Sequence, residues 1–281
     1  MFNHNPFQNC RNVGTTSGGV ELHINEELMR CDLKIGIGSI SPHPVNGFGG
    51  GGKLIIIGTA GMETIHQLHT KAAECASRKK LGFTSGIGNL ELDGMRTQIE
   101  EAVEMVGLDF KVDAILDSGC RIVECTAGHP NVEYYKGCEL SGRLNRSDKL
   151  PEGMDVVIAN ANVKANEAAI ALSVASAALK PSGGALVLVD HTPMGQVNHQ
   201  YSGASGYYTG GPAYRGIADR FPGVDKVIFY SPFPDVASAI SFGDNRRILF
   251  AETWSEVMEY LSVYGAGTKA AVLSDATIMA F

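Results

Sequence analysis

The sequence predicts an α/β protein made of two α/β domains, the second with a small Rossmann-like parallel sheet. The first observation behind this class is that short β-branched and aliphatic runs alternate with longer segments of helical composition. The second is the length, because 281 residues can form two ordinary domains. The third is a polar segment near the middle of the chain, after which the order of the elements changes.

The first half contains five patterned segments before that polar stretch. Residues 32–40, "DLKIGIGSI", predict a strand, and residues 54–58, "LIIIG", predict a second, buried strand. Residues 62–79 have a helix-forming composition and a basic end, and residues 96–107 predict a helix that stops at Gly107. Residues 110–128 predict a β-hairpin.

The segment 139–153, "ELSGRLNRSDKLPEG", is polar and has no apolar period, so we place a domain boundary there. We therefore expect an amino-terminal domain over 1–140 and a carboxy-terminal domain over 141–281. The second domain is predicted to contain strands at 154–161, 185–192, 225–231 and 269–275, with helices at 166–180 and 253–265. This order is typical of a Rossmann-like sheet, but no G-x-G-x-x-G follows the first strand, so dinucleotide binding is not predicted.

Composition excludes several classes of function. The net charge of −7 disfavours a nucleic-acid or membrane-surface role, and no apolar run is long enough for a membrane helix. The first residues lack a basic and an apolar region, so we expect a cytoplasmic protein. The six cysteines form no C-x-x-C pair, which predicts free thiols instead of a zinc ribbon or a disulfide framework.

A glycine-rich segment, "HPVNGFGGGGKLIIIG" at residues 43–58, is the most distinctive feature of the sequence. Gly47, Gly52 and Lys53 have the spacing of the first part of a phosphate-binding P-loop. However, Leu54 has no hydroxyl to hold Mg²⁺, and Lys53 opens a predicted strand where a P-loop needs a helix. A nucleotide hydrolase is therefore disfavoured. We predict that the glycines have no packing role and instead let the backbone approach a bulky ligand.

Three histidines bracket Lys53 in the sequence. His43 precedes it by ten residues, while His66 and His69 follow it and share one face of the predicted helix. The loop histidine, the lysine and a helix histidine could meet in one pocket, and imidazole is a common metal ligand. The alternative is that each histidine is an ordinary surface or core residue.

Residues 13–69, "VGTTSGGVELHINEELMRCDLKIGIGSISPHPVNGFGGGGKLIIIGTAGMETIHQLH", resemble the lactate racemase family, the nickel-pincer nucleotide enzymes. The resemblance keeps the order and spacing of His43, Lys53 and His69. It implies that Lys53 tethers a pyridinium mononucleotide through a thioamide, with Phe48, Gly49 and Gly50 also binding this cofactor. It further implies that His69 ligates the nickel, that His43 is one of two acid/base groups, and that a hydroxy acid is racemised by hydride transfer.

The chain also departs from this family. The family's amino-terminal segment carries a second catalytic histidine, and neither His4 nor His23 stands in such a motif. A partner chain that supplies the segment, a truncated chain and a loss of racemase activity are the three explanations. We favour the partner, and with it an oligomer, because a sheet without its first strands exposes an edge. The alternative function is a non-catalytic family member that carries cofactor or metal, or that associates with a partner.

Lactate is disfavoured as the substrate, because the family's lactate-contacting Tyr, Gln and Lys after Asn166 are replaced by Ala168, Ala169 and Leu172. The glycine-rich segment 202–216 could supply other contacts, or it is simply a surface loop. Its candidate side chains are Tyr207, Tyr208, Tyr214 and Arg215. His191 follows a predicted strand, where site residues are common, and a structural role is the alternative.

Overall fold

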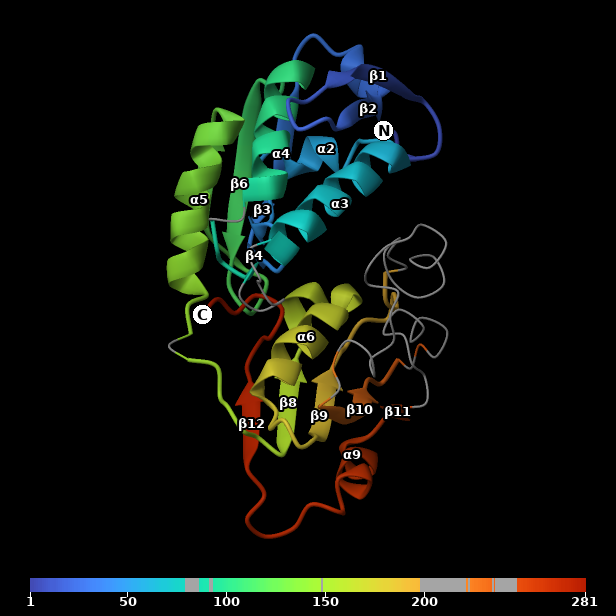
Figure 1. Cartoon of the computed structure of the whole chain (residues 1–281), viewed down its shortest axis with the longest axis vertical. Coiled ribbons are helices and arrows are strands. Elements are labelled where there is room, and N and C mark those ends of the chain that lie inside the picture. The colour runs from blue at the N-terminus through green and yellow to red at the C-terminus, as the bar shows by residue number, and fades with distance from the viewer. Residues whose placement is uncertain are drawn as a thin grey trace. The chain divides into compact units, whose positions relative to one another are not determined.

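The computed structural model describes residues 1–78, 86–90, 93–147, 149–197, 221, 223–233, 235 and 247–281 (Figure 1). It divides into two compact units, Met1–Arg146 with Ala280 and Ser147–Met279 with Phe281. Both units combine helices with strands, so the predicted α/β class is confirmed. The domain boundary predicted at residue 140 stays a prediction.

Unit 1 begins with a hairpin that the sequence did not predict, and it ends with a helix that was also missed. Its strands are β1 (Cys10–Thr15), β2 (Glu21–Asn25), β3 (Ile35–Ile40), β4 (Pro42–His43), β5 (Gly47–Phe48), β6 (Phe110–Leu116) and β7 (Ile122–Gly128). Its helices are α1 (Glu26–Met29), α2 (Lys53–Ile56), α3 (Met62–Arg78), α4 (Asp93–Val106) and α5 (Pro130–Leu144). The predicted strand at 32–40, both long helices and the 110–128 hairpin are present.

The helix α5 shows why part of the 139–153 segment was misread as a linker. Residues 139–144 are the last turns of this helix, which begins with Pro130 after the capping residue His129. The buried face of α5 includes Gly137, Cys138 and Ser141, which are small or polar residues. Such a face gives little apolar periodicity, so the pattern on which helix prediction depends is absent.

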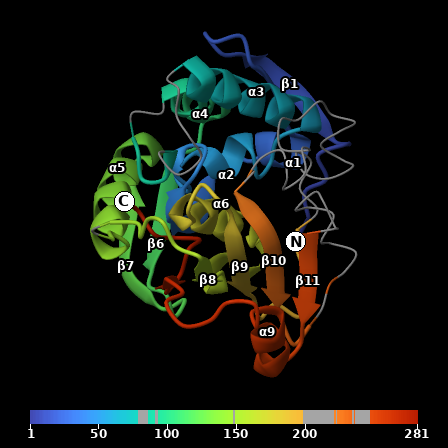
Figure 2. The same ribbon diagram turned by 60° about the horizontal axis from the view of Figure 1, so that its bottom comes forward.

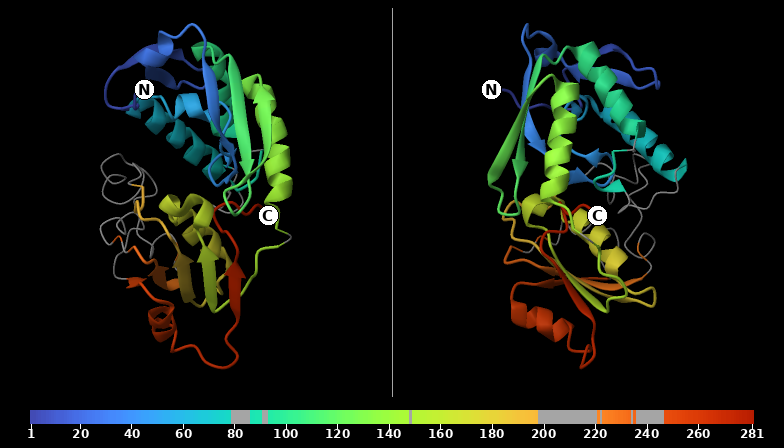
Figure 3. Two further views of the ribbon diagram at one scale, coloured as in Figure 1. Left: turned by 180° about the vertical axis from the view of Figure 1, so that it is seen from behind. Right: turned by 90° about the vertical axis from the view of Figure 1, so that its left-hand side faces the viewer.

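A sheet of order β3-β6-β7 forms the side of unit 1 that carries the candidate site. β3 runs parallel to β6, and β6 runs antiparallel to β7. Helix α5 covers one face of the sheet, as the rear and side views show (Figure 3). On the opposite face Ile35, Ile37 and Phe110 are 54%, 74% and 42% exposed, so that face presents apolar side chains to solvent.

The prediction of a strand at 54–58 was wrong. Residues 53–56 form the helix α2, which begins at Lys53 with Gly52 as its capping residue. Isoleucines favour strands because of their β-branching, but the preference is weak and packing overrides it. Here Ile55 and Ile56 are both buried in the main core of unit 1.

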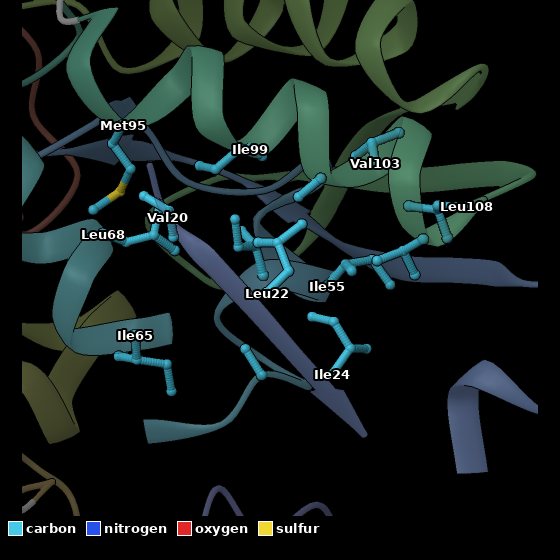
Figure 4. Close-up of a cluster of buried hydrophobic side chains, with 14 of the residues drawn as sticks. Val20, Leu22, Ile24, Ile55, Ile65, Leu68, Met95, Ile99, Val103 and Leu108 are labelled. Carbon is cyan, nitrogen blue, oxygen red and sulfur yellow. The ribbon is translucent and has the colours of Figure 1, made fainter. Parts of the chain in front are cut away.

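That core lies between the β1–β2 hairpin and the helices α2, α3 and α4 (Figure 4). Val20, Leu22 and Ile24 from the hairpin region meet Ile99 and Val103 of α4. All five side chains are at most 1% exposed. The close packing fixes the position of α2, and therefore of Lys53 at its start.

Unit 2 is built on a parallel five-stranded sheet of order β11-β10-β9-β8-β12 (Figure 2). Its elements are β8 (Val156–Asn160), the 3₁₀ helix η2 (Asn162–Glu167), α6 (Ala169–Ala178), β9 (Gly184–Val189), β10 (Val224–Tyr230), β11 (Ile248–Ala251), α9 (Trp254–Tyr260) and β12 (Ala270–Leu273). The predicted parallel sheet is confirmed, with β11 as a strand that the sequence analysis missed. Of the helices within the described ranges, none is long and apolar enough to cross a lipid bilayer.

Candidate active site around Lys53

The glycine loop of unit 1 joins β5 to α2 and is tightly packed against its surroundings. Gly50 and Gly51 have φ values of +84° and +60°, a region that side-chain-bearing residues rarely adopt. A Cβ on Gly50 would lie 2.6 Å from the carbonyl oxygen of Ser39, and one on Gly51 would lie 2.6 Å from Cδ2 of Tyr134. The expectation that these glycines have no packing role was therefore wrong. Of the two predicted cofactor-binding glycines, Gly49 has more room, with its nearest neighbour at 3.8 Å.

The buried carboxylate of Asp113 binds the backbone of the glycine loop. The backbone N–H of Gly51 donates to Oδ2 of Asp113 at 2.7 Å, and Oδ1 of the same carboxylate contacts Nζ of Lys111. Both charged side chains are fully buried. Two glycines of β3 leave room for these side chains. A Cβ on Gly36 would lie 2.7 Å from Cδ of Lys111, and a Cβ on Gly38 would lie 3.0 Å from Oδ1 of Asp113. In the sequence "IGIG" every second residue of β3 is a glycine, and these glycines pair with Lys111 and Asp113 of β6. This alternation is the sequence signal for the buried ion pair.

A second carboxyl group lies beside the first. Glu133 of α5 is buried, and its Oε2 accepts a hydrogen bond from the hydroxyl of Thr126 at 2.7 Å. Burial, and after it the negative charge of Asp113, raises the pKa of Glu133 to about 7. The charge of Asp113, which supports the glycine loop, therefore contributes to keeping this carboxyl group protonated. Sequence reasoning missed both acids, because nothing in the local pattern marks them as buried.

The same loop is also fastened to α5 through its predicted cofactor-binding residue Phe48. The side chain of Phe48 is buried, and its carbonyl oxygen accepts hydrogen bonds from the Tyr134 hydroxyl at 3.1 Å and from Nδ2 of Asn46 at 2.9 Å. Phe48 thus packs into the protein, and its backbone is fixed from two sides.

The structure brings two of the predicted site residues together. Nζ of Lys53 lies 2.9 Å from Nε2 of His43, and both side chains are half-buried. His43 faces Gly47 in the short β4–β5 ladder, which turns the chain back so that residues ten apart can meet. The structure therefore pairs the amine with an imidazole at the start of α2.

Both ring nitrogens of His43 lie within hydrogen-bond distance of a neighbouring group. The backbone N–H of Val45 donates to Nδ1 at 3.2 Å. Nε2 faces Nζ of Lys53, so the short β4–β5 ladder orients the imidazole toward the amine.

His69 lies on α3, half-buried, and its Nδ1 is 2.8 Å from the carbonyl oxygen of Ile65. Because a carbonyl only accepts, Nδ1 carries the proton, and the lone pair of a neutral ring is on Nε2. A hydrogen bond of this kind commonly orients a metal-ligating histidine. Within the described ranges no group of three or more His, Cys, Asp or Glu side chains could hold a metal, and the role of His69 stays a prediction.

Two further candidates were named from the sequence, His191 and the segment 202–216. The ring of His191 in unit 2 makes an edge contact with Tyr230, with ring centroids 5.9 Å apart. Residues 202–216, with the three tyrosines and Arg215, lie outside the described residues.

Comparison with known proteins finds a similarity to lactate racemases. Residues 1–80 match the lactate racemase N-terminal domain. Lactate racemase from Thermoanaerobacterium thermosaccharolyticum is 30% identical over 151 residues, which are 54% of this chain and 34% of the relative. Residues 1–80 thus resemble the lactate racemase family. Lactate racemase from Lactiplantibacillus plantarum is 27% identical over 133 residues, which are 47% of this chain and 30% of the relative. The matched segments thus span about a third of these two lactate racemases.

Solved structures of similar fold extend the likeness over both units. The lactate racemase apoprotein from T. thermosaccharolyticum has a TM-score of 0.69 at 21% identity, covering 98% of this chain and 69% of that one. A Thermotoga maritima protein from structural genomics has a TM-score of 0.67 at 15% identity, covering 100% of this chain and 77% of that one. At these identities the structures establish the shared fold alone. The likeness to racemases rests on the sequence matches, of which the domain match covers residues 1–80.

Proposed function

We propose that this chain is a subunit of a racemase or epimerase that acts on a 2-hydroxy acid other than lactate, with a nickel-pincer nucleotide carried on Lys53. The observation that supports the proposal best is the Lys53–His43 pair at the end of a rigid glycine loop. The similarity to lactate racemases supports the reaction class, and the resemblance described above supplies the cofactor.

The residues present fit such a group in two respects. Lys53 presents a primary amine at the start of α2, the group needed for a covalent link to a cofactor, and Nε2 of His43 lies 2.9 Å from its Nζ. The Nδ1 contact of His69 leaves the Nε2 lone pair as the basic site of the ring, as nickel ligation requires. In this proposal Lys53 holds the nucleotide, and His69 is a ligand of its metal.

The chemistry divides between the cofactor and the chain. When bound, the cofactor accepts a hydride from the substrate carbon and returns it. His43 takes the proton of the substrate hydroxyl and gives it back, which is general acid/base catalysis. Asp113 and Tyr134 take no part in proton transfer; they hold the backbone of the loop so that Lys53 and His43 keep their relative position.

The substrate is proposed to differ from lactate because unit 2 offers apolar side chains at the start of α6. Ala168 and Leu172 are fully buried, and Ala169 is the first residue of the helix. None of the three can donate a hydrogen bond to a carboxylate from its side chain.

A partner chain is the second part of the proposal. The uncovered face of the β3-β6-β7 sheet presents Ile35 and Ile37 beside Phe110, and Ile35 pairs directly with Phe110 across β3 and β6. Exposed apolar side chains that lie together commonly mark an interaction site. The chain spans 69% of the T. thermosaccharolyticum apoprotein chain, so we propose that a polypeptide supplying the remaining part covers this face, together with the second acid/base group.

Mass spectrometry of the intact chain tests the cofactor. The chain is co-expressed with the enzymes that make the nucleotide, and we expect an adduct that maps to the peptide containing Lys53. Lys53→Ala should abolish the adduct, whereas Lys71→Ala should keep it. His69→Ala should lose bound nickel while His66→Ala, one turn away on α3, retains it. An unmodified Lys53 in cells shown to load another family member would contradict the proposal.

Size-exclusion chromatography with light scattering tests the partner. The part of T. thermosaccharolyticum lactate racemase that this chain does not span is co-expressed with it, and we expect a one-to-one complex. Ile37→Asp should dissociate the complex, and Val263→Asp, an equally exposed apolar site in unit 2, should not. A homodimer that Ile37→Asp disrupts would replace the proposed partner with a second copy of the chain.

A further inference from the structure

Arg96 of α4 carries a buried charge for which the described residues supply no anion. The residue is 6% exposed, and neither Nε nor Nη2 has a hydrogen-bond partner among the described residues. These two nitrogens form the edge of the guanidinium whose N–H groups point side by side. That edge binds the two oxygens of a carboxylate or phosphate in bidentate fashion.

The guanidinium is held in place independently of any ligand. Its Cζ lies 3.6 Å from the centre of the Tyr134 ring, a close cation–π contact. The Tyr134 hydroxyl donates to the carbonyl oxygen of Phe48, and the Tyr134 ring lies where a side chain on Gly51 would be. A Cβ on Gly52 would lie 2.2 Å from Cγ2 of Val103 and 3.1 Å from Cγ2 of Ile99, both on the same helix as Arg96. Arg96 is thus fixed beside the glycine loop.

The acidic side chains near Arg96 bind other groups. Glu100 of α4 accepts a hydrogen bond from the Tyr135 hydroxyl at 2.6 Å, and Glu101 accepts one from the backbone N–H of Ser17, also at 2.6 Å. Glu104 accepts one from Nδ2 of Asn131 at 3.0 Å. No ion pair within the described ranges includes Arg96. A buried charge without a counterion is costly, so the site favours an anion that comes from outside the described chain.

We infer that Arg96 is the binding site for an oxyanion, and specifically for the phosphate group of a mononucleotide. The oxyanion follows from the two unpaired N–H groups and the positive charge. The choice of phosphate rests on the proposed function, because a nucleotide carried on Lys53 at the end of the same loop would bring a phosphate group into this region. The site binds it through charge-assisted hydrogen bonds, with no covalent step.

The test uses the full chain without cofactor, labelled with ¹⁵N, and follows the arginine Nε–H resonances by NMR. Arg96→Lys assigns the Arg96 signal by its absence. This variant keeps a positive charge but lacks the bidentate edge. Inorganic phosphate is added at constant ionic strength, and we expect a saturable shift of the Arg96 signal. Because this measurement is made on the wild-type chain, it does not depend on whether a variant folds.

Binding is then compared among variants by calorimetry with inorganic phosphate and with nicotinic acid mononucleotide as probes. We expect Arg96→Lys to weaken both at least about tenfold, equivalent to roughly 1.4 kcal/mol, and Arg30→Gln, an exposed control, to leave both unchanged. We also expect the mononucleotide to bind more tightly than its riboside, which lacks the phosphate.

Three results would overturn the inference. An Arg96 signal that does not respond to phosphate, or equal binding by wild type and Arg96→Lys, would remove the oxyanion site. Acetate binding more tightly than phosphate would keep an oxyanion site but reject phosphate as its occupant. None of these three results depends on an adduct at Lys53. Failure of the proposed function would therefore appear separately, as an unmodified lysine beside an intact phosphate site.

Discussion

Replacing Asp113 with asparagine should destabilise unit 1 strongly, because the carboxylate is the counterion of a fully buried lysine. Lys111 and Asp113 both have no exposed side-chain surface. Removing one partner of a buried ion pair typically costs about 3–5 kcal/mol, since the other charge stays buried and uncompensated. That is a large part of the roughly 5–15 kcal/mol by which domains are stable. Asparagine can still accept the Gly51 N–H, so most of the loss comes from the charge of Lys111.

The loss of stability in Asp113→Asn should also depend on pH, which provides a second test. Removing the negative charge of Asp113 lowers the pKa of Glu133, which that charge helps to raise. Glu133 then ionises more readily in the variant and can replace the missing counterion of Lys111. The destabilisation should therefore be larger at pH 6, where Glu133 holds its proton more often, than at pH 8.

Urea unfolding followed by circular dichroism measures these effects. The double variant Lys111→Met/Asp113→Leu is the control, because replacing both members of a buried pair with apolar residues is often neutral. It leaves the Gly51 N–H unpaired, so we expect a cost of about 1–3 kcal/mol, less than that of Asp113→Asn. A single variant within about 1 kcal/mol of wild type, or a double variant that is less stable than the single one, would refute the ion-pair reasoning.

Three further predictions concern the same site. Glu133→Gln should remove a pH dependence of the stability of unit 1. The pKa of Glu133 is about 7 in the folded chain against 4.5 in the unfolded chain, so the folded chain binds this proton more tightly. The wild-type free energy of unfolding should therefore fall by on the order of 3 kcal/mol as pH rises between these two values. Urea midpoints from pH 4 to pH 8 check this, and identical profiles would contradict it. Gly51→Ala should lower the free energy of unfolding by about 2–4 kcal/mol, because residue 51 has a left-handed backbone and its Cβ would contact Tyr134. Gly49→Ala, the control, should stay near wild type in thermal unfolding. Equal losses for the two variants would disprove the packing argument. Tyr134→Phe should cost about 1 kcal/mol, because Asn46 still donates to the Phe48 carbonyl, and a loss above about 3 kcal/mol would mean that the hydroxyl has another role.

The sequence determined those elements whose own residues carry a clear period or composition. Strand β3, the helices α3 and α4 and every strand of the parallel sheet except β11 followed from apolar patterning or composition, since each buries one face or a whole strand against a core. Lys53 and His43 could be singled out from the glycine-rich segment and its resemblance to a known family. Their contact at 2.9 Å depends on the two-residue strands β4 and β5, which are too short to leave a pattern.

Only the tertiary structure decided which face of β6 is inside. By alternation alone, Phe110 and Val112 would point to the core, and Lys111 and Asp113 to solvent. The fold reverses this, because Gly36 and Gly38 of β3 make room for the charged side chains while α5 brings Glu133 over them. Local propensity specifies helix or strand, whereas the direction of a side chain depends on partners that are distant in the sequence. The ion pair beneath the glycine loop and the apolar face on the other side of the sheet both come from that long-range choice.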